Sequence, residues 1–557
     1  MHTFYSNRRD YNDWYSIPQI EKKIDPLKLK LFSKDQFELV DNNDNIIRLI
    51  SSPVRDYDHH PGVLILQNNR TYGKAKNNRM LYKCIPNDKT LPIFLIPYDL
   101  HIGFVKDYTN KYVLFSFRNW DGKHPVGVIR ETFGNVDNYS SFCSYQLWCN
   151  RLVFSIAKFN RQVKIYQNHN SEESLIQNIL QNNKYNIEDK RNENVFTIDP
   201  EGSKDLDDGI SITELPNENY KISIYIANVY IMLDQLELWD KLTDRVSTIY
   251  LPEDRRTLLP DLLSDDFCSL LENKDRISFC MEFVYSKQNK LVLNESIRFF
   301  NAIINVKNNY RYEEQELLDT NSYQNLYKVT KNINNDIIDS HDVVAHWMIY
   351  MNTIAAETLH KHKTGIFRVV SKKEDIVSNN DDQMRHKISL WNNVSGSYEK
   401  YVEDLNTKHE VLNVSSYLHV TSPIRRAVDI VNQIYFFKYL FKVELCENCD
   451  KFVSRFEMRI PQLNDDVKAI RKVQSECDLL YACKNDETIL ENQYEGYVFN
   501  KKYENNQFIY SVFLKSLNKI SFFRSSNEIE EHDIRIFKLY LFDRENSGHR
   551  KIRLALI

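Results

Sequence analysis

The sequence contains little glycine, no long hydrophobic run and no low-complexity linker. Glycine accounts for 12 of 557 residues, about 2% where proteins average about 7%, and no internal repeat is visible. No segment approaches the roughly 20 apolar residues of a membrane-spanning helix, and no apolar segment follows the first residues as in a signal peptide. We therefore predict no membrane association and expect an intracellular, soluble and cytoplasmic protein.

The cysteine content argues against a zinc ribbon, and the net charge argues against a uniformly basic nucleic-acid-binding protein. The nine cysteines are an odd number, and the C-x-x-C pair Cys446 and Cys449 has no second pair at zinc-ribbon spacing. We therefore expect a reduced chain without a zinc ribbon. With 73 basic and 77 acidic residues the net charge is −4, which argues against a uniformly basic nucleic-acid-binding surface. The net charge does not exclude a local positive channel, because such a channel depends on how the charges are distributed and not on their sum.

The chain is long enough for about three to four domains. Short strand-like runs at 113–117 and 126–129, with turn signals between them, favour a small barrel. The central part of the chain has a mixed α/β pattern, with a period-two strand at 220–226 and helices at 343–361, 423–441 and 465–483. A polar connector at 170–195 precedes it. The predicted division is an irregular segment or one strand pair at 1–60, an OB-like barrel region at 61–180, a catalytic region at 190–485 and a second barrel at 490–557.

Four aspartates form the strongest chemical signal. Asp199 ends a short apolar strand, and Asp205, Asp207 and Asp208 follow a turn that contains proline and glycine. Carboxylates this close together repel one another and raise one another's pKa unless a cation lies among them. Hard oxygen ligands suit Mg²⁺, and Mn²⁺ as an alternative.

Two other interpretations of this cluster are a calcium-binding loop and an acidic turn without metal. A calcium EF-hand loop starting at Asp205 fails, because Gly209 occupies the fifth place instead of the sixth and Pro216 stands where the bidentate glutamate belongs. The other interpretation is an acidic, solvated turn that binds no metal, and these residues alone do not exclude it.

A pair of arginines forms the second signal. Ser422 followed by Pro423 is typical of a helix start, which places Arg425 and Arg426 in the first helical turn. The helix dipole disfavours cations there by about 0.3–1 kcal/mol each, so the pair favours binding of an anion such as phosphate. The alternative is an ion pair between Arg425 and Asp429 within the helix.

Together these segments resemble the catalytic domain, called RNB, of the ribonuclease II family. Residues 196–209 are similar to the family's aspartate signature, and residues 417–426 to its Thr-Ser-Pro-Ile-Arg-Arg signature. Further similar blocks follow the family's order at 247–252, 258–276, 348–356 and 365–368. Residues 120–134 resemble the OB-fold before the catalytic domain of eukaryotic members, and residues 495–498 resemble part of the C-terminal OB-fold.

The resemblance implies a multidomain fold: an α/β (α+β) RNB domain flanked by all-β OB-fold barrels. Because the barrel pattern begins by about residue 61, we expect no additional endonuclease domain of the kind that the exosome catalytic subunit carries ahead of its first OB-fold.

The resemblance also implies roles for individual residues. Asp199, Asp205, Asp207 and Asp208 stand where the family holds magnesium and organises the attacking water, with Asp207 catalytic. Arg425 stands at the arginine that steadies the scissile phosphate. The predicted RNA-binding residues are Tyr250, near the 3′ end of the substrate, Arg426, and Glu476, for which an exposed helix charge is the alternative.

Several positions depart from the family pattern. Ala427 replaces an aromatic residue, Asn228 an aspartate and Gln433 a frequent histidine, and Thr364 falls where some members carry a base-stacking phenylalanine. These differences affect what can be expected of rate, terminal product length and base stacking. They leave the four aspartates in place.

The sequence therefore predicts a magnesium-dependent, processive 3′-to-5′ exoribonuclease that hydrolyses single-stranded RNA to nucleoside 5′-monophosphates. The alternative is a catalytically inactive RNB-fold protein that binds RNA or serves as a scaffold. A third interpretation is a phosphodiesterase that acts on DNA.

Overall fold

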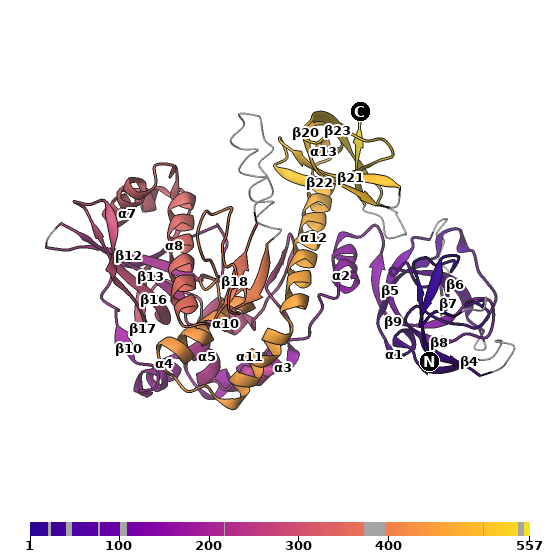
Figure 1. Ribbon diagram of the computed structural model, residues 1–557, viewed down its shortest axis with the longest axis horizontal. Coiled ribbons are helices and arrows are strands. Elements are labelled where there is room, and N and C mark those ends of the chain that lie inside the picture. The colour runs from indigo at the N-terminus through magenta and orange to yellow at the C-terminus, as the bar shows by residue number, and fades with distance from the viewer. Residues whose placement is uncertain are drawn as a thin grey trace. The chain divides into compact units, whose positions relative to one another are not determined.

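The computed structural model describes residues 1–20, 24–40, 47–75, 78–100, 108–216, 218–371, 396–504, 506–543 and 551–557. The chain divides into two compact units. The first combines residues 1–153, 251–253 and 471–557, and the second combines residues 154–250 and 254–470. Figure 1 follows the chain through its elements from the N-terminus to the C-terminus.

Residues 1–60 form a small antiparallel sheet with its own core. Its strand order is β2-β1-β3-β4, and its strands are β1 (His2–Ser6), β2 (Trp14–Ile17), β3 (Gln36–Leu39) and β4 (Ile47–Ser51). Phe4, Tyr11 and Phe37 are buried in one cluster. The prediction of an irregular segment or a single strand pair is wrong here, because strands of four or five residues are too short to show a clear period-two pattern.

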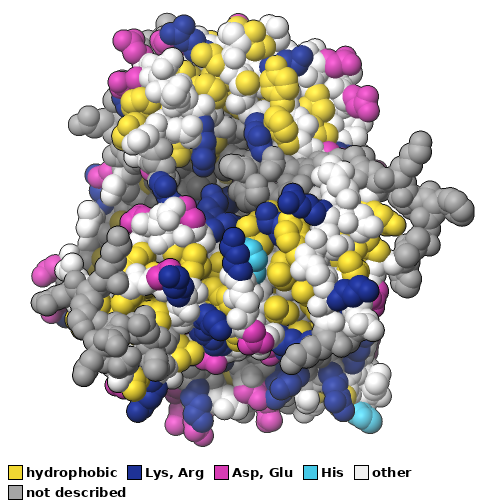
Figure 2. Space-filling view, turned by 90° about the vertical axis from the view of Figure 1, so that its right-hand side faces the viewer, with side chains coloured by type: hydrophobic (Ala, Val, Ile, Leu, Met, Phe, Trp, Pro, Cys, Tyr) yellow, Lys and Arg dark blue, Asp and Glu magenta, His cyan; other side chains and the backbone are white. Residues whose placement is uncertain are grey.

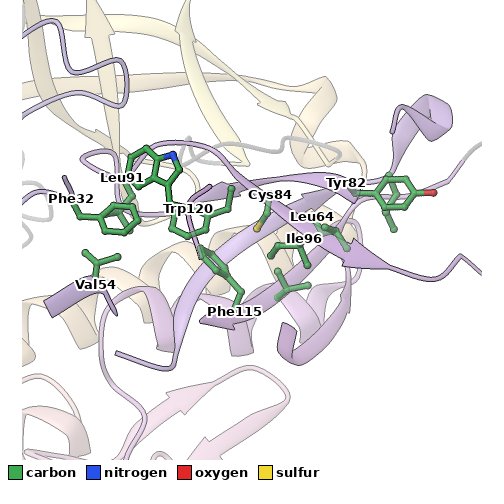
Figure 3. Packing of buried hydrophobic residues seen from close by; sticks show 12 residues of the cluster. Phe32, Val54, Leu64, Tyr82, Cys84, Leu91, Ile96, Phe115 and Trp120 are labelled. Atoms are coloured by element: carbon green, nitrogen blue, oxygen red, sulfur yellow. The ribbon is translucent and has the colours of Figure 1, made fainter. Parts of the chain in front are cut away.

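The next residues form a closed barrel, β5-β6-β7-β9-β8. Its strands are β5 (His60–Ile65), β6 (Met80–Pro86), β7 (Phe94–Tyr98), β8 (Lys111–Asn119) and β9 (Val126–Asn135). Figure 3 shows the core of this barrel, in which Phe32 and Trp120 pack with Phe115 and Leu64. Such closure leaves no free strand edge.

The segment after this barrel is helical. It contains α2 (Tyr139–Cys149), α3 (Ala157–His169) and α4 (Glu172–Gln181). The barrel therefore ends well before residue 180, and the predicted polar connector at 170–195 contains the ten-residue helix α4. The reason is a strong start signal: the Ser171 side chain caps α4, and Glu172 and Glu173 lie in its first turn.

A second five-stranded antiparallel sheet follows the long helix α12 (Ile460–Asn485), with the order β22-β21-β20-β23-β24. Its elements are α13 (Thr488–Glu491), β20 (Gln493–Glu504), β21 (Gln507–Leu514), β22 (Lys519–Ser525), β23 (Ile534–Leu541) and β24 (Ile552–Leu556). Gly496 is required in β20, because a Cβ there would lie 2.5 Å from the ring of Phe537.

The second unit is built on a six-stranded mixed sheet of order β10-β17-β11-β12-β13-β16, in which β17 also pairs with β16. Its strands are β10 (Ile187–Asp189), β11 (Val195–Asp199), β12 (Asp208–Glu214), β13 (Tyr220–Ala227), β16 (Asp275–Ser286) and β17 (Leu291–Arg311). Residues from β11, β13, β16 and β17 share one buried cluster that includes Val195, Tyr225 and Ile304. The mixed α/β centre predicted from the sequence is confirmed.

Helices pack against this sheet. In Figure 1, α8 (Ser340–Lys361) runs alongside it, and Trp347 of α8 lies 5.3 Å, centroid to centroid, from Phe283 of β16. Phe436, which follows α10 (Ala427–Tyr435), contacts Phe279 of β16 at 5.0 Å. The remaining elements are α1 (Pro53–Asp56), η1 (Gln67–Asn69), α5 (Val229–Gln235), η2 (Trp239–Lys241), β14 (Ile249–Leu251), β15 (Asp254–Arg256), η3 (Leu263–Phe267), α6 (Gln315–Leu318), α7 (Asn321–Ile333), β18 (Ile366–Val369), β19 (Ser397–Lys400), η4 (Phe436–Leu440) and α11 (Glu447–Met458).

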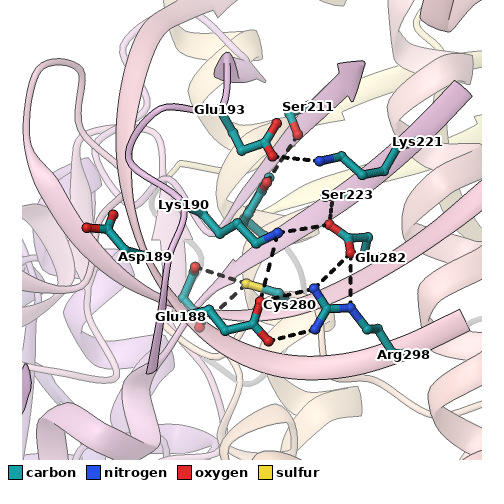
Figure 4. Close-up of polar contacts among 12 residues, drawn as sticks. Glu188, Asp189, Lys190, Glu193, Ser211, Lys221, Ser223, Cys280, Glu282 and Arg298 are labelled. Atoms are coloured by element: carbon teal, nitrogen blue, oxygen red, sulfur yellow. Dashed lines mark hydrogen bonds and ion pairs between the residues drawn. The ribbon is translucent and has the colours of Figure 1, made fainter. Parts of the chain in front are cut away.

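One part of the sheet carries a network of ion pairs (Figure 4). Arg298 lies 2.6 Å from Glu188 and 2.8 Å from Glu282, and Lys190 lies 3.3 Å from Glu282. These cations are held by carboxylates of the same sheet, so the network serves to stabilise the charges that β10, β16 and β17 bring together.

Within the described ranges, no helix is long and apolar enough to cross a membrane.

Candidate active site

The sheet brings the four aspartates to one end of the β11–β12 hairpin. β11 ends at Asp199 and β12 begins at Asp208, and the two strands pair antiparallel with Phe196 opposite Ile210. Asp199 and Asp208 thus lie at the same end of the hairpin, close enough for their charges to repel. Gly202 supports the loop between the strands, because its φ of +79° lies in the left-handed region that favours glycine.

The loop that carries these aspartates is tied down by backbone contacts. The Ser269 hydroxyl donates to the carbonyl of Lys204 at 2.7 Å and accepts from the backbone N–H of Leu206 at 3.0 Å. The N–H of Ala227 donates to the carbonyl of Asp207 at 2.8 Å. The acidic segment is therefore a fixed part of the sheet edge, which differs from a mobile, fully solvated turn.

The arginine segment adopts a different conformation from the one predicted. The helix α10 begins at Ala427 with Arg426 in the capping position, so the predicted helix start at Ser422 is wrong. Arg426 forms an isolated bridge with Ser247, and the carbonyl of Arg425 accepts from the N–H of Thr248 at 2.9 Å. Residues 423–425 form a turn, in which the N–H groups of Arg425 and Arg426 donate to the carbonyl of Ser422. The contacts with Ser247 and Thr248 hold Arg426 extended, so no continuous helix begins at Ser422 and the helix-dipole argument for anion binding no longer applies.

Arg425 nevertheless reaches the aspartates. Its Nε donates to Oδ2 of Asp207 at 3.2 Å and its Nη2 donates to the Ser422 hydroxyl at 3.1 Å. The N–H of Ile424 donates to the other Asp207 oxygen at 2.8 Å. Asp207 is 2% exposed whereas the Arg425 side chain is 45% exposed. The guanidinium of Arg425 therefore contacts a buried carboxylate while part of its side chain remains accessible to solvent.

Arg426 has a different partner. Its guanidinium donates to both oxygens of the buried Asp429, at 2.8 and 2.9 Å, and the N–H of Ser422 donates to the same carboxylate at 2.7 Å. The alternative pairing of Arg425 with Asp429 is therefore wrong. The predicted contact of Arg426 with RNA stays a prediction.

Tyr250 lies beside the cluster. Its hydroxyl donates to Oδ2 of Asp205, and Arg255 donates to Oδ1 of the same residue at 3.1 Å. Arg255 also binds Asp265 in a bidentate manner, at 2.7 and 2.6 Å. Tyr250 is 38% exposed, which is more than a core residue and leaves part of its ring accessible.

Two residues near the aspartates were not identified from the sequence. One is Arg255, which orients Asp205. The other is Tyr312, whose N–H donates to the carbonyl of Asp199 at 3.3 Å and whose ring stacks on His341 with centroids 3.6 Å apart. Burial and the negative charges of Asp208 and Asp199 raise the pKa of the Tyr312 phenol. No local motif marks Tyr312, because β17 brings it to the site over more than 100 residues.

Burial and mutual repulsion disfavour the charged forms of these carboxyl groups. Burial, and then repulsion by Asp208, raises the pKa of Asp199 to about 7, and burial raises the pKa of Asp208 to about 6. Burial also raises the pKa of Asp207, whereas Arg425 and the N–H of Ile424 favour its charged form. A cation among these groups would stabilise their charged forms.

The donor chemistry of the cluster fits a hard divalent cation. All four residues offer carboxylate oxygens, and in the described part of the chain Oδ2 of Asp199 is buried without a hydrogen-bond partner. Among the same residues, no three or more His, Cys, Asp or Glu side chains are already arranged around one point. Asp205 and Asp207 are engaged by Tyr250, Arg255 and Arg425, so metal binding would require side-chain rotation.

The positions that depart from the family pattern are integrated in the fold. Asn228 caps α5 and donates to Asn301 at 3.0 Å, and Gln433 donates to the carbonyl of Ala227 at 2.9 Å. Ala427 and Thr364 are buried. Glu476 is half-buried on α12 within the first unit, so its proximity to the aspartates stays a prediction.

The sheet, the carboxylate edge and the arginine segment define an RNB catalytic domain. The family model described as "RNB domain" matches residues 187–335 and 318–442, a region that contains all four aspartates and Arg425. Residues 187–442 of this chain therefore form an RNB domain. The family resemblance and the fold class predicted from the sequence are both confirmed.

Curated relatives align over part of this region. DIS3-like exonuclease 2 of Schizosaccharomyces pombe is 29% identical over 226 residues, which are 38% of this chain and 23% of the relative. Ribonuclease R of Thermotoga maritima is 31% identical over 147 residues, 26% of this chain and 20% of the relative. Exoribonuclease 2 of Vibrio cholerae is 37% identical over 116 residues, 21% and 16%. The aligned parts thus span less than a quarter of these relatives' own length.

Solved structures share the whole fold. The apo form of Mycoplasma genitalium RNase R has a TM-score of 0.68 and 16% identity, with all of both chains covered. Yeast Ssd1, described as a pseudonuclease, has a TM-score of 0.59 and 15% identity over 90% of this chain and 69% of its own. At these identities the likeness establishes the fold.

Proposed function

We propose that the protein is a magnesium-dependent, processive 3′-to-5′ exoribonuclease that hydrolyses single-stranded RNA to nucleoside 5′-monophosphates. The observation that carries this proposal is the placement of Arg425 against Asp207, at the sheet edge where the four aspartates gather. Mn²⁺ is an alternative cofactor, because it accepts the same oxygen ligands.

The aspartates would hold the metal, and the surrounding contacts would orient them. Oδ2 of Asp199 has no competing hydrogen bond in the described residues, and Asp208 lies beside it in the hairpin. Asp205 is oriented by Tyr250 and Arg255, and Asp207 by Ile424 and Arg425. The chemistry that Mg²⁺ supplies when bound is acidification of a water molecule and neutralisation of phosphate charge.

Arg425 is suited to the phosphate itself. A guanidinium has five N–H donors in a planar fork, and its contacts with Asp207 and Ser422 fix the plane of this one. With 45% of the side chain exposed, the fork can donate to the non-bridging oxygens of the scissile phosphate. Donors held in place before the reaction stabilise charge that develops in the transition state.

Several features support RNA as the substrate. The rings of Tyr250 and Tyr312 lie beside the carboxylates, where each can stack on a base. Lys and Arg side chains are prominent on the face drawn in Figure 2, although the net charge is −4. Related Mycoplasma genitalium RNase R structures contain double-stranded RNA and ribose-methylated single-stranded RNA.

The alternative proposal is an RNB-fold protein that binds RNA without cutting it. The likeness to Ssd1, a pseudonuclease, and the lack of a ready-made metal arrangement in the described residues support it. All four aspartates and Arg425 are present, which favours the active enzyme.

One experiment distinguishes these functions. Purified protein is incubated with 5′-labelled single-stranded RNA in Mg²⁺, in Mn²⁺ or with chelator, and a single-stranded DNA of the same sequence serves as a second substrate. We expect a ladder that shortens from the 3′ end of the RNA only when metal is present. RNA binding without a ladder would identify the non-cutting protein, and equal cleavage of the DNA would identify a general phosphodiesterase.

A further inference from the structure

A small pocket in the unit of residues 154–250 and 254–470 is lined by arginines that the catalytic site does not use. Arg245 lies on one side, and Arg455 and Arg459 lie on the other, at and just after the end of α11, with Asp244 between them. Phe452 and Phe456 of α11 form its apolar wall.

The buried member of this set has an unused donor. Arg245 is 6% exposed, its Nη1 donates to the carbonyl of Thr257 and its Nη2 donates to the carbonyl of Phe154 at 2.9 Å. Within the described part of the chain its Nε has no hydrogen-bond partner. Leaving a buried, charged N–H unpaired is costly, so a ligand that accepts from this atom would stabilise the pocket.

Positive charge is in excess around the pocket. Asp244 is shared by two arginines, 2.7 Å from Arg459 and 3.6 Å from Arg455, so three guanidiniums face one carboxylate. Burial raises the pKa of the nearby Asp466 carboxyl, whereas Arg459 favours its charged form. An anion is therefore the favoured ligand.

The dimensions of the pocket limit that anion. Its enclosed cavity volume is about 10 Å³, which is about enough for one water-sized atom. Arg455 and Arg459 are 44% and 33% exposed, so the mouth is open to solvent. One oxygen of a tetrahedral phosphate can enter toward Arg245 while its other oxygens meet the two arginines outside. A nucleobase cannot enter.

We propose that this pocket is a second anion site that binds a single phosphate group between Arg245, Arg455 and Arg459. The phosphate can belong to inorganic phosphate, to a nucleoside 5′-monophosphate or to the backbone of an RNA strand. All three ligands offer the phosphate group that the pocket binds. They differ in the part of the ligand that stays outside the pocket.

The test measures phosphate binding by calorimetry, in chelator and at constant ionic strength. The parent chain carries Arg425→Gln, because Arg425 is itself expected to bind phosphate, and chelator removes any dependence on hydrolysis. We expect saturable binding of inorganic phosphate that weakens at least about tenfold in Arg455→Gln/Arg459→Gln, as when charge-assisted hydrogen bonds are removed. The control Lys438→Gln removes another ion pair, between η4 and α11, and should change binding less than about twofold.

Arg245→Gln should have the same effect as the double variant. If that chain does not fold, the double variant decides the question, since its guanidiniums lie at the exposed mouth. A nucleoside 5′-monophosphate or a short RNA that binds more tightly than inorganic phosphate, with the same sensitivity to the double variant, identifies the physiological source. Absence of saturable binding, or binding equal in the parent and the double variant, overturns the proposal and leaves a water molecule as the occupant.

Discussion

Nε of Arg425 lies 3.2 Å from Oδ2 of Asp207, although the two residues are 218 positions apart in the chain. The contact joins the two segments with the strongest chemical signals in the sequence. It also explains how a half-exposed guanidinium is held in one orientation, because the carboxylate that holds it is buried and accepts a backbone N–H as well.

Asp208→Asn is expected to abolish RNA cleavage and to leave RNA affinity near that of the wild type. The change removes a charged metal ligand and little volume, and losing one key electrostatic contributor costs roughly 10²–10³ in rate. Single-turnover cleavage and equilibrium RNA binding are measured side by side. Glu201→Gln is the matched control, because Glu201 is an exposed carboxylate of the same loop. An Asp208→Asn rate above about a tenth of the wild-type rate would contradict the metal assignment.

Arg425→Lys is expected to be nearly inactive. Lysine keeps the charge but cannot hold Asp207 and a phosphate with one planar group. The measurement is kcat on single-stranded RNA, with Arg298→Lys as the control for an arginine that pairs with carboxylates elsewhere in the same unit. Wild-type activity in Arg425→Lys would mean that this arginine only supports the fold.

Tyr250→Ala should weaken the binding of a short RNA by about 1–3 kcal/mol, the usual contribution of one stack between a base and an aromatic ring. Tyr250→Phe keeps the ring and loses only the hydrogen bond to Asp205, so it should retain RNA affinity and raise the Mg²⁺ concentration needed for cleavage. Unchanged affinity in Tyr250→Ala would show that the ring does not contact RNA.

Mg²⁺ binding should strengthen as pH rises from 6 to 8. With a pKa of about 7, Asp199 is roughly nine-tenths protonated at pH 6 and one-tenth at pH 8. Because a metal requires the deprotonated carboxylate, we expect an affinity about tenfold higher at pH 8.

The pH dependence of stability follows from the same group. A carboxyl whose folded-state pKa is raised from its ordinary value of about 3.9 stabilises the fold at low pH, and this contribution is lost as pH rises through about 7. The metal-free protein should therefore lose stability between about pH 4 and pH 7, and Mg²⁺ should raise Tm more at pH 8 than at pH 6. Equal Tm increases at both pH values, or the same pH dependence in Asp199→Asn, would argue against Asp199 as the ligand.

Covalently circular RNA should survive while linear RNA of the same sequence is degraded from its 3′ end. The proposed exonuclease acts on a free terminus, so a substrate without ends offers it no starting point. Both RNAs are treated with enzyme and Mg²⁺ and compared on a denaturing gel. Cleavage of the circle at the linear rate, lost in Asp208→Asn, would require an endonucleolytic active site.

The candidate site residues could be proposed from the sequence, and the structure brings Arg425 to Asp207; their chemical roles stay a prediction. The aspartate and arginine motifs are short segments whose residue types and spacing carry their meaning, and the long amphipathic helix α8 (Ser340–Lys361) shows its period over 22 residues. The four-stranded sheet at 1–60 could not be recognised in the same way, because its strands are only four or five residues long. The helix α4 has a capping signal at Ser171 but spans only ten residues, too few to show its period clearly.

The sequence by itself determined which residues are candidates for the site, and the tertiary structure decided how they are arranged. Ser422 and Pro423 carry a valid helix-start signal, yet they begin only a turn: backbone contacts with 246–248 hold Arg426 extended, and α10 begins at Ala427. Tyr312, Arg255 and the pocket around Arg245 have no local motif at all. Their roles depend on strand register and on contacts between distant segments, which follow from burial of the whole sheet and cannot be derived from any single stretch of residues.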